Sequence, residues 1–136
     1  MSDDANRSAL ERAWKAIQDG DLDPYEEILA EDCVQEWPQS GEVIRGKANI
    51  TAVNRNYPGF PSMKVRELRG GGDLWVGEAE LDYHGRRVLF CSIWEMRDGT
   101  IVRETDYFSD PFDAPQWRAR WVERPETRPP PPATRW

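Results

Sequence analysis

Apolar residues recur every three or four positions in the first part of the chain and alternate with polar residues in the second part. The first pattern is typical of a helix with one buried face, and the second of a half-buried strand. The helical pattern predicts helices over residues 5–19, about 23–31 and about 47–57. The other patterns predict a short strand over 33–38, a loop over 38–46, and four strands over about 62–69, 73–83, 86–97 and 100–108. Three helices followed by an antiparallel meander form an α+β pattern.

A tight hairpin is predicted between the second and third strands of the meander, with His84 and Gly85 at its tip. This register turns two small residues, Gly77 and Ala79, toward the helices. Missing side-chain volume under a layer of helices predicts a cavity, unless a large helix residue such as Trp14 fills the space. A cavity lined with a few polar groups is the usual pattern of a ligand site.

The last hairpin decides which way the acidic residues of the final strand point. A two-residue loop over Asp98 and Gly99 would turn Arg103 inward. A three-residue loop with Gly99 as a bulge shifts the pairing by one residue and exchanges the two faces. This bulged register pairs Val102 with Trp94, Glu104 with Ser92, Asp106 with Phe90 and Phe108 with Val88. We favour it because it gathers the apolar side chains on one face, so Glu104 and Asp106 are expected to face the helices.

Glu104 and Asp106 would then be two carboxyl groups in an apolar interior, with Cα atoms about 6.6 Å apart. Two charged carboxylates would repel there, so at least one pKa should rise. A carboxyl group kept neutral can donate a proton while its partner acts as a base, which suits proton abstraction next to a carbonyl group. In this interpretation Asp106 is the base and Glu104 is the neutral donor or orienting group. The structural alternative is a buried ion pair with an arginine, for which the candidates are Arg45, Arg55 and Arg118.

Aromatic residues are expected to line the cavity together with the two acids. The candidates for ligand binding are Trp14, Trp37, Tyr57, Phe60, Phe90, Ser92, Trp94 and Phe108. Ordinary core packing is the alternative for several of these aromatic side chains. If they do line a cavity, the expected ligand is a hydrophobic small molecule.

The composition narrows the class of protein. Of the 136 residues, 38% are hydrophobic and 32% are charged, which predicts a soluble globular protein. The net charge of -7 argues against nucleic acid or an anionic membrane as the main partner, and no apolar run is long enough to cross a membrane. The start of the chain shows no secretion-signal pattern, and the two cysteines, Cys33 and Cys91, fit no ligand spacing. We therefore expect free thiols in the cytoplasm, no metal site and no cofactor.

The composition changes near the end of the chain. Residues 1–124 are expected to form a single domain. From residue 125 the chain is rich in proline, which predicts an extended or disordered tail over residues 125–136.

Three segments carry a resemblance to a known family: ERAWKAIQDGDLDPYEEILAEDCVQEWP, IRGKANI and SIWEMRDGTIVRETDYF. Over residues 8–112 the chain resembles the nuclear transport factor 2-like superfamily, and within it the SnoaL-like branch that includes polyketide cyclases. The resemblance implies a cone-shaped α+β barrel, in which three N-terminal helices pack on a curved antiparallel sheet and enclose a pocket. It also implies a homodimer through the sheet, whose outer face is expected to present Leu89, Cys91, Ile93 and Ile101.

The same resemblance argues against steroid isomerisation. Where ketosteroid isomerases of this superfamily carry a general-base aspartate this chain has Trp37, and their two oxyanion-hole residues correspond to Ala13 and Trp94. The cyclases resemble this chain in carrying acids on the last strands, which implies a catalytic role for Asp106. Three hypotheses remain. The first is a cofactor-independent lyase, isomerase or cyclase that acts on a hydrophobic carbonyl compound, and the second is a non-catalytic protein that binds a small ligand in the same aromatic pocket. The third, with the least support in the sequence, is an interaction domain whose sheet surface or proline-rich tail docks another protein.

Overall fold

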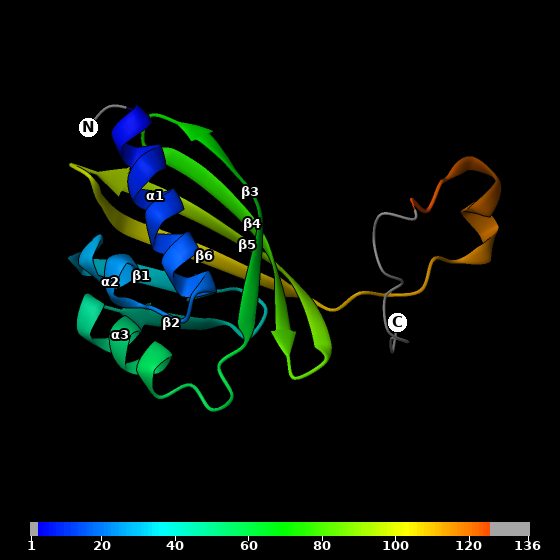
Figure 1. Cartoon of the computed structure of the whole chain (residues 1–136), viewed down its shortest axis with the longest axis horizontal. Helices are drawn as coiled ribbons and strands as arrows, with labels where there is room; N and C mark the ends of the chain where they lie inside the picture. The colour runs from blue at the N-terminus through cyan, green and yellow to red at the C-terminus, as the bar shows by residue number, and fades with distance from the viewer. Residues whose placement is uncertain (1–2, 126–136) are drawn as a thin grey trace.

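The computed structural model describes residues 3–125, which form three α-helices, a six-stranded sheet and a short 3-10 helix (Figure 1). The helices are α1 (Asp3–Gln18), α2 (Asp23–Glu27) and α3 (Lys47–Arg55). The strands are β1 (Leu29–Trp37), β2 (Glu42–Arg45), β3 (Ser62–Gly71), β4 (Leu74–Tyr83), β5 (Arg86–Arg97) and β6 (Thr100–Ser109), and the 3-10 helix is η1 (Gln116–Trp121). This element order confirms the predicted α+β class.

The strands form one curved, unclosed sheet in the order β2-β1-β6-β5-β4-β3 (Figure 1). α1 lies against β3 and α2, and α3 lies against β1 and β2. β1 runs parallel to β6, so the prediction of an antiparallel sheet is wrong for this one pair. The long connection through α3 and the meander allows β1 to lie beside β6 in the same direction. None of the helices within residues 3–125 is long and apolar enough to span a membrane.

The predicted second helix is too long, and the predicted loop over 38–46 contains a strand. α2 ends at Glu27, and the chain continues from Leu29 as β1, which pairs with β2 through residues 34–37. β2 is mostly exposed, so hydrogen bonds to β1 rather than an apolar pattern make it a strand. Hydrophobic alternation alone therefore predicts neither the start of β1 at Leu29 nor the presence of β2.

Trp14 fills the space above Gly77. Its indole ring meets that of Trp94 edge to face, with the ring centroids 4.9 Å apart. A Cβ atom on Gly77 would lie 2.4 Å from Trp94 and 2.6 Å from Trp14. The helix residue therefore occupies the volume that the glycine leaves, and the cavity described below lies beside Trp14 rather than over Gly77.

Replacing Gly77 with alanine is expected to destabilise the protein by about 1–3 kcal/mol, because the added methyl group forces two buried indole rings to move. Urea unfolding followed by circular dichroism measures the effect. Gly71→Ala is the matched control, since a Cβ atom there meets nothing nearer than 3.4 Å. Equal unfolding midpoints for the two variants would show that the packing over Gly77 is loose.

The last hairpin turns through two residues, Asp98 and Gly99, whose φ angles are 51° and 79°. The predicted three-residue loop is therefore wrong, and the extra residue is instead Val102, which forms a bulge inside β6. The pairs are Arg97–Thr100 and Met96–Ile101 before the bulge, and Glu95–Arg103, Trp94–Glu104, Ser92–Asp106 and Phe90–Phe108 after it. The bulge exchanges the faces as the predicted loop does, but the predicted pairs are wrong by two residues, since Glu104 meets Trp94 rather than Ser92 and Asp106 meets Ser92 rather than Phe90. Glu104 and Asp106 consequently face the interior, and each is 4% exposed.

The bulge also changes the outer face of the sheet. Ile101 is fully buried and its N–H donates a hydrogen bond to the Ile28 carbonyl oxygen at 2.7 Å, so Ile101 does not belong to the predicted outer surface. Leu89, Cys91 and Ile93 alternate with the inward residues of β5 and are half-buried. A homodimer through this face stays a prediction.

Residues 110–125 leave the sheet after β6 and form an arm that projects from the rest of the protein (Figure 1). The arm contains η1, in which Trp117 and Trp121 are 71% and 68% exposed. No pattern in the sequence predicts η1. The predicted proline-rich tail, residues 125–136, lies outside the described residues except for Pro125.

Candidate functional site

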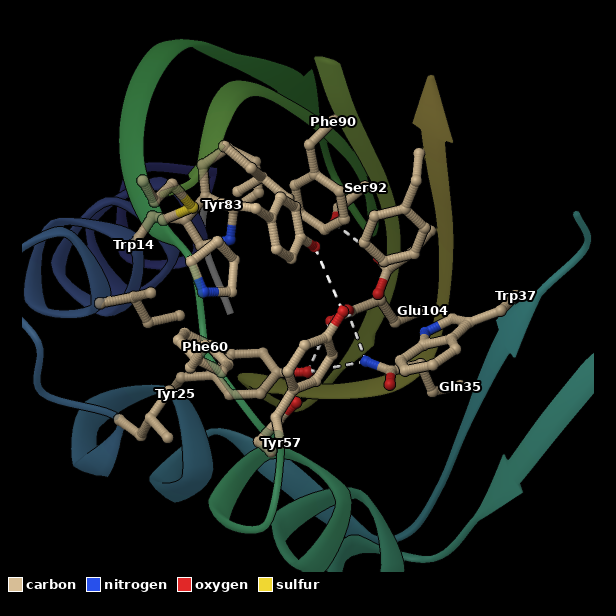
Figure 2. A pocket seen from close by; sticks show the side chains of 18 residues that line it. Trp14, Tyr25, Gln35, Trp37, Tyr57, Phe60, Tyr83, Phe90, Ser92 and Glu104 are labelled. Carbon is tan, nitrogen blue, oxygen red and sulfur yellow. Dashed lines mark hydrogen bonds between the residues drawn. The ribbon is translucent and has the colours of Figure 1, made fainter. Parts of the chain in front are cut away.

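Glu104 is the acceptor of a buried hydrogen-bond cluster (Figure 2). Its carboxyl oxygens accept hydrogen bonds from Tyr25 Oη at 2.9 Å, Gln35 Nε2 at 2.7 Å and Trp94 Nε1 at 2.8 Å. Burial, and then the charge of Glu104, raise the pKa of Tyr25 well above its usual value, so the Tyr25 hydroxyl remains a donor. Three donors on one side chain provide the hydrogen bonds that a buried carboxylate needs.

Asp106 is the next inward residue of β6 and has a different environment. Ser92 Oγ donates a hydrogen bond to Asp106 Oδ1 at 2.5 Å. The pKa of Asp106 is raised well above its usual value, first by burial and then by the charge of Glu104. Ser92 and the Trp37 indole N–H act in the opposite direction without reversing the shift. The neutral form of Asp106 is therefore favoured by its surroundings, and the roles of the two acids as base and donor stay a prediction.

The buried-ion-pair alternative is wrong for each arginine that the sequence suggested. Arg55 Nη2 instead lies 2.6 Å from Asp23 Oδ1 and 2.8 Å from Glu26 Oε1. Arg118 stacks on an indole ring in the arm, and Arg45 is exposed on β2. Within residues 3–125, no salt bridge neutralises either of the two acids.

The two acids border a cavity of about 80 Å³ between the sheet and the helices (Figure 2). Nine of the ten predicted site residues line it: Trp14, Trp37, Tyr57, Phe60, Phe90, Ser92, Glu104, Asp106 and Phe108. Trp94 is the exception, because it is fully buried under Trp14 and serves as a donor to Glu104. The role of the lining residues in ligand binding stays a prediction.

Aromatic side chains make up much of the cavity wall. Trp37 meets Phe108 edge to face, with the ring centroids 5.6 Å apart. The hydroxyl oxygens of Tyr57 and Tyr83 lie 3.3 Å from each other, and Phe60 beside them is 41% exposed. An apolar wall with polar groups gathered in one part suits a small, largely apolar ligand that has one polar end.

Four polar lining residues are missing from the sequence prediction: Tyr25, Gln35, Asn54 and Tyr83. The position of Gln35 in the site can be predicted, because Gln35 and Trp37 are alternate residues of the predicted strand and face the same side. The position of Tyr25 cannot be predicted, because its contact with Glu104 joins residues 79 positions apart.

Comparisons with known proteins agree with this fold. The SnoaL-like domain family matches residues 10–104, so the chain belongs to this family. A solved NTF-2 like protein of unknown function from Burkholderia xenovorans LB400 is 43% identical, with a TM-score of 0.84 over 89% of this chain and 95% of that one. These findings confirm the resemblance to nuclear transport factor 2-like and SnoaL-like proteins.

Two further solved structures resemble the chain at lower identity. A ketosteroid isomerase-like protein from Kribbella flavida DSM 17836 is 26% identical, with a TM-score of 0.82 over 90% of each chain. An LEH-like epoxide hydrolase from M. tuberculosis is 26% identical, with a TM-score of 0.64 over 79% of this chain and 84% of that one. A search of curated protein sequences found no match.

Proposed function

We propose that the protein binds a small hydrophobic carbonyl compound in this cavity and catalyses a cofactor-independent isomerisation, cyclisation or elimination by proton transfer through Asp106 and Glu104. The observation that carries the proposal is the carboxyl pair. Two buried carboxyl groups on alternate residues of β6 border one cavity, no arginine within residues 3–125 neutralises them, and burial raises the pKa of one of them, Asp106, well above its usual value. Ionisable groups perturbed in this way concentrate at functional sites.

The pair is suited both to give and to accept a proton. When Asp106 holds the shared proton, it can donate to a carbonyl or leaving-group oxygen; when Glu104 holds it, Asp106 can accept a proton from the carbon next to the carbonyl group. In an enolisation the C–H bond breaks, its electron pair forms the C=C bond, and the carbonyl π pair moves to the oxygen. Return of a proton to carbon restores the starting state of the two carboxyl groups.

The size of the cavity limits the ligand. At roughly 10–15 Å³ for each enclosed water, a cavity of 80 Å³ holds about six waters. That is close to the space of a single six-membered ring, so the deep part of the cavity holds about one ring. A second hollow of about 290 Å³ shares Trp37, Tyr57, Tyr83 and Phe108 with the cavity and can take the rest of a longer ligand. The relatives described as a ketosteroid isomerase-like protein and an epoxide hydrolase support small-molecule chemistry on this fold.

Exchange of α-hydrogens with D2O tests the proposal without knowledge of the natural substrate. Cyclohexanone, 2-cyclohexenone and phenylacetone are incubated with the protein, and deuterium incorporation is followed by proton NMR. The wild-type protein is expected to accelerate exchange of at least one ketone. Asp106→Asn should keep the fold and reduce that rate by about 100-fold or more, because it removes the group that transfers the proton.

Glu95→Gln is the matched control, since this exposed carboxylate lies next to Trp94 on the opposite face of β5 and should leave the rate unchanged. An unchanged rate in Asp106→Asn would contradict the assignment. Ketones that bind, as judged by NMR line broadening, but never exchange would favour the non-catalytic binding protein instead.

A further inference from the structure

Two polar atoms on the cavity wall lack hydrogen bonds. Gln35 Oε1 and Trp37 Nε1 are buried, and neither has a hydrogen-bond partner among the described residues. Both side chains line the cavity that the two acids border. Buried polar atoms without a partner are destabilising and uncommon in native proteins, so a partner from outside the chain would complete this site.

The orientation of the Gln35 amide is fixed by its neighbours. Its nitrogen donates to Glu104 Oε2 at 2.7 Å and to Tyr25 Oη at 3.1 Å. A flipped amide would place its oxygen against the Glu104 carboxylate, so Oε1 is held as an acceptor. The Trp37 indole N–H can only donate. It lies near enough to Asp106 to lower the pKa of that carboxyl group, but it makes no hydrogen bond to it. This part of the wall thus offers one acceptor and one donor that have no partner within the part of the chain that the structure describes.

These two atoms are placed so that one ligand can use both. Gln35 and Trp37 are alternate residues of β1, so their side chains leave the same face of the strand from Cα atoms about 6.6 Å apart. Figure 2 shows both side chains extending from β1 toward the part of the cavity that contains Glu104. A group that satisfies both atoms carries an acceptor and a donor a few bonds apart, as a carboxamide or an α-hydroxy ketone does. A simple ketone satisfies only Trp37.

We propose that Gln35 and Trp37 form a subsite that selects small apolar ligands carrying a carbonyl oxygen and a neighbouring N–H or O–H. Trp37 donates to the ligand oxygen, and Gln35 accepts from the ligand N–H or O–H. This rests on the proposed function in placing the ligand in the same cavity, but it does not depend on proton transfer by Asp106. The aromatic wall accommodates the rest of the ligand, of which the deep part of the cavity holds about one ring.

Three probes of nearly the same shape test the subsite. Benzamide carries the acceptor and the donor, acetophenone carries the acceptor alone, and α-methylstyrene carries neither. Dissociation constants are measured by NMR titration of the full chain. Benzamide is expected to bind about tenfold more tightly than acetophenone, which corresponds to one additional buried hydrogen bond.

Two variants separate the contribution of the Trp37 N–H from that of the Gln35 amide oxygen. Trp37→Phe keeps an aromatic wall but removes the N–H, so benzamide and acetophenone should each bind about tenfold more weakly while α-methylstyrene changes by less than about twofold. Gln35→Met should abolish the preference for benzamide over acetophenone. Trp117→Phe, which changes an exposed indole in the arm, is the control and should leave all three constants unchanged. Circular dichroism checks the fold of each variant, and Trp37→Phe alone decides the question if Gln35→Met does not fold.

Equal affinities of wild type for benzamide and acetophenone, or binding of neither, would overturn the subsite. Wild-type affinities in Trp37→Phe would do the same. These outcomes are separate from those of the exchange assay. Ketone exchange without selectivity for benzamide contradicts only the subsite, and selectivity without exchange contradicts only the catalytic role of the acids.

Discussion

Replacing Glu104 with alanine is expected to lower the free energy of unfolding by about 3–5 kcal/mol. The substitution leaves three buried donors, Tyr25 Oη, Gln35 Nε2 and Trp94 Nε1, without their acceptor. Each donor left unpaired costs about 1–3 kcal/mol. Trp94 Nε1 is covered by Trp14 and bears this cost in full, whereas Tyr25 and Gln35 line the cavity, where water offsets part of it. Relief of the repulsion with Asp106 acts in the opposite direction, but it is one interaction against three.

Urea unfolding at neutral pH measures this loss. Glu104→Gln should lose less stability, since the amide oxygen still accepts hydrogen bonds although its NH2 group then faces a donor. Glu95→Ala, on the exposed face of the neighbouring strand, is expected to change the free energy of unfolding by no more than about 0.5 kcal/mol. A Glu104→Ala protein as stable as Glu95→Ala would mean that the three donors find other partners.

The second large effect is a loss of stability with rising pH that originates in Asp106. The pKa of Asp106 is raised in the folded protein, so the folded state binds this proton more tightly than the unfolded chain does. Its stabilising contribution is complete below the unfolded pKa of about 4 and is lost as the pH rises toward the folded pKa. Within that window the loss is about 1.4 kcal/mol for each pH unit.

Asp106→Asn removes this titration and keeps the shape of the side chain. The free energy of unfolding of Asp106→Asn relative to wild type should therefore rise by about 1.4 kcal/mol for each pH unit within the window. Paired urea curves at several pH values between about 4 and 8 measure the difference. Groups that titrate in both proteins cancel in this comparison. One of them is Glu80, whose pKa is lowered by its hydrogen bond to Arg87 and whose effect on stability therefore changes with pH in the opposite direction. A difference that does not vary with pH would show that Asp106 titrates alike in the folded and unfolded states.

The inward direction of the two acids is predictable from the sequence, but the way the chain achieves it is not. The apolar side chains of the last two strands gather on one face only when Glu104 and Asp106 also face inward, and registers that differ by two residues share this property, so the faces are predictable although the pairs are not. The position of the extra residue depends on a contact between distant segments. The N–H of Ile101 is bonded to the Ile28 carbonyl oxygen, which holds Ile101 in the core and leaves Val102 as the bulge. No local pattern in the hairpin contains that information.

The same limit applies to the site. Aromatic residues at inward positions are visible in the sequence, whereas the hydrogen bonds that distinguish Glu104 from Asp106 come partly from donors on α2 and β1. Parallel pairing of β1 with β6 sets Gln35 opposite Glu104, and the sequence indicates neither the length of β1 nor its direction. Trp94 faces inward as predicted, but Trp14 covers it and separates it from the cavity. Whether an inward side chain reaches the cavity depends on how α1 crosses the sheet, which the sequence does not indicate.

The bulge at Val102 has a consequence for how genes of this family can change in length. Because Val102 has no cross-strand partner, loss of its codon would leave every other pairing of β6 with β5 as it is, and both acids would still point inward. Loss of the codon for Thr105 would instead move Asp106 to the outer surface, although the acid itself would still be encoded. A lineage that keeps both acids facing the cavity therefore has to inherit the spacing between them as strictly as the acids themselves.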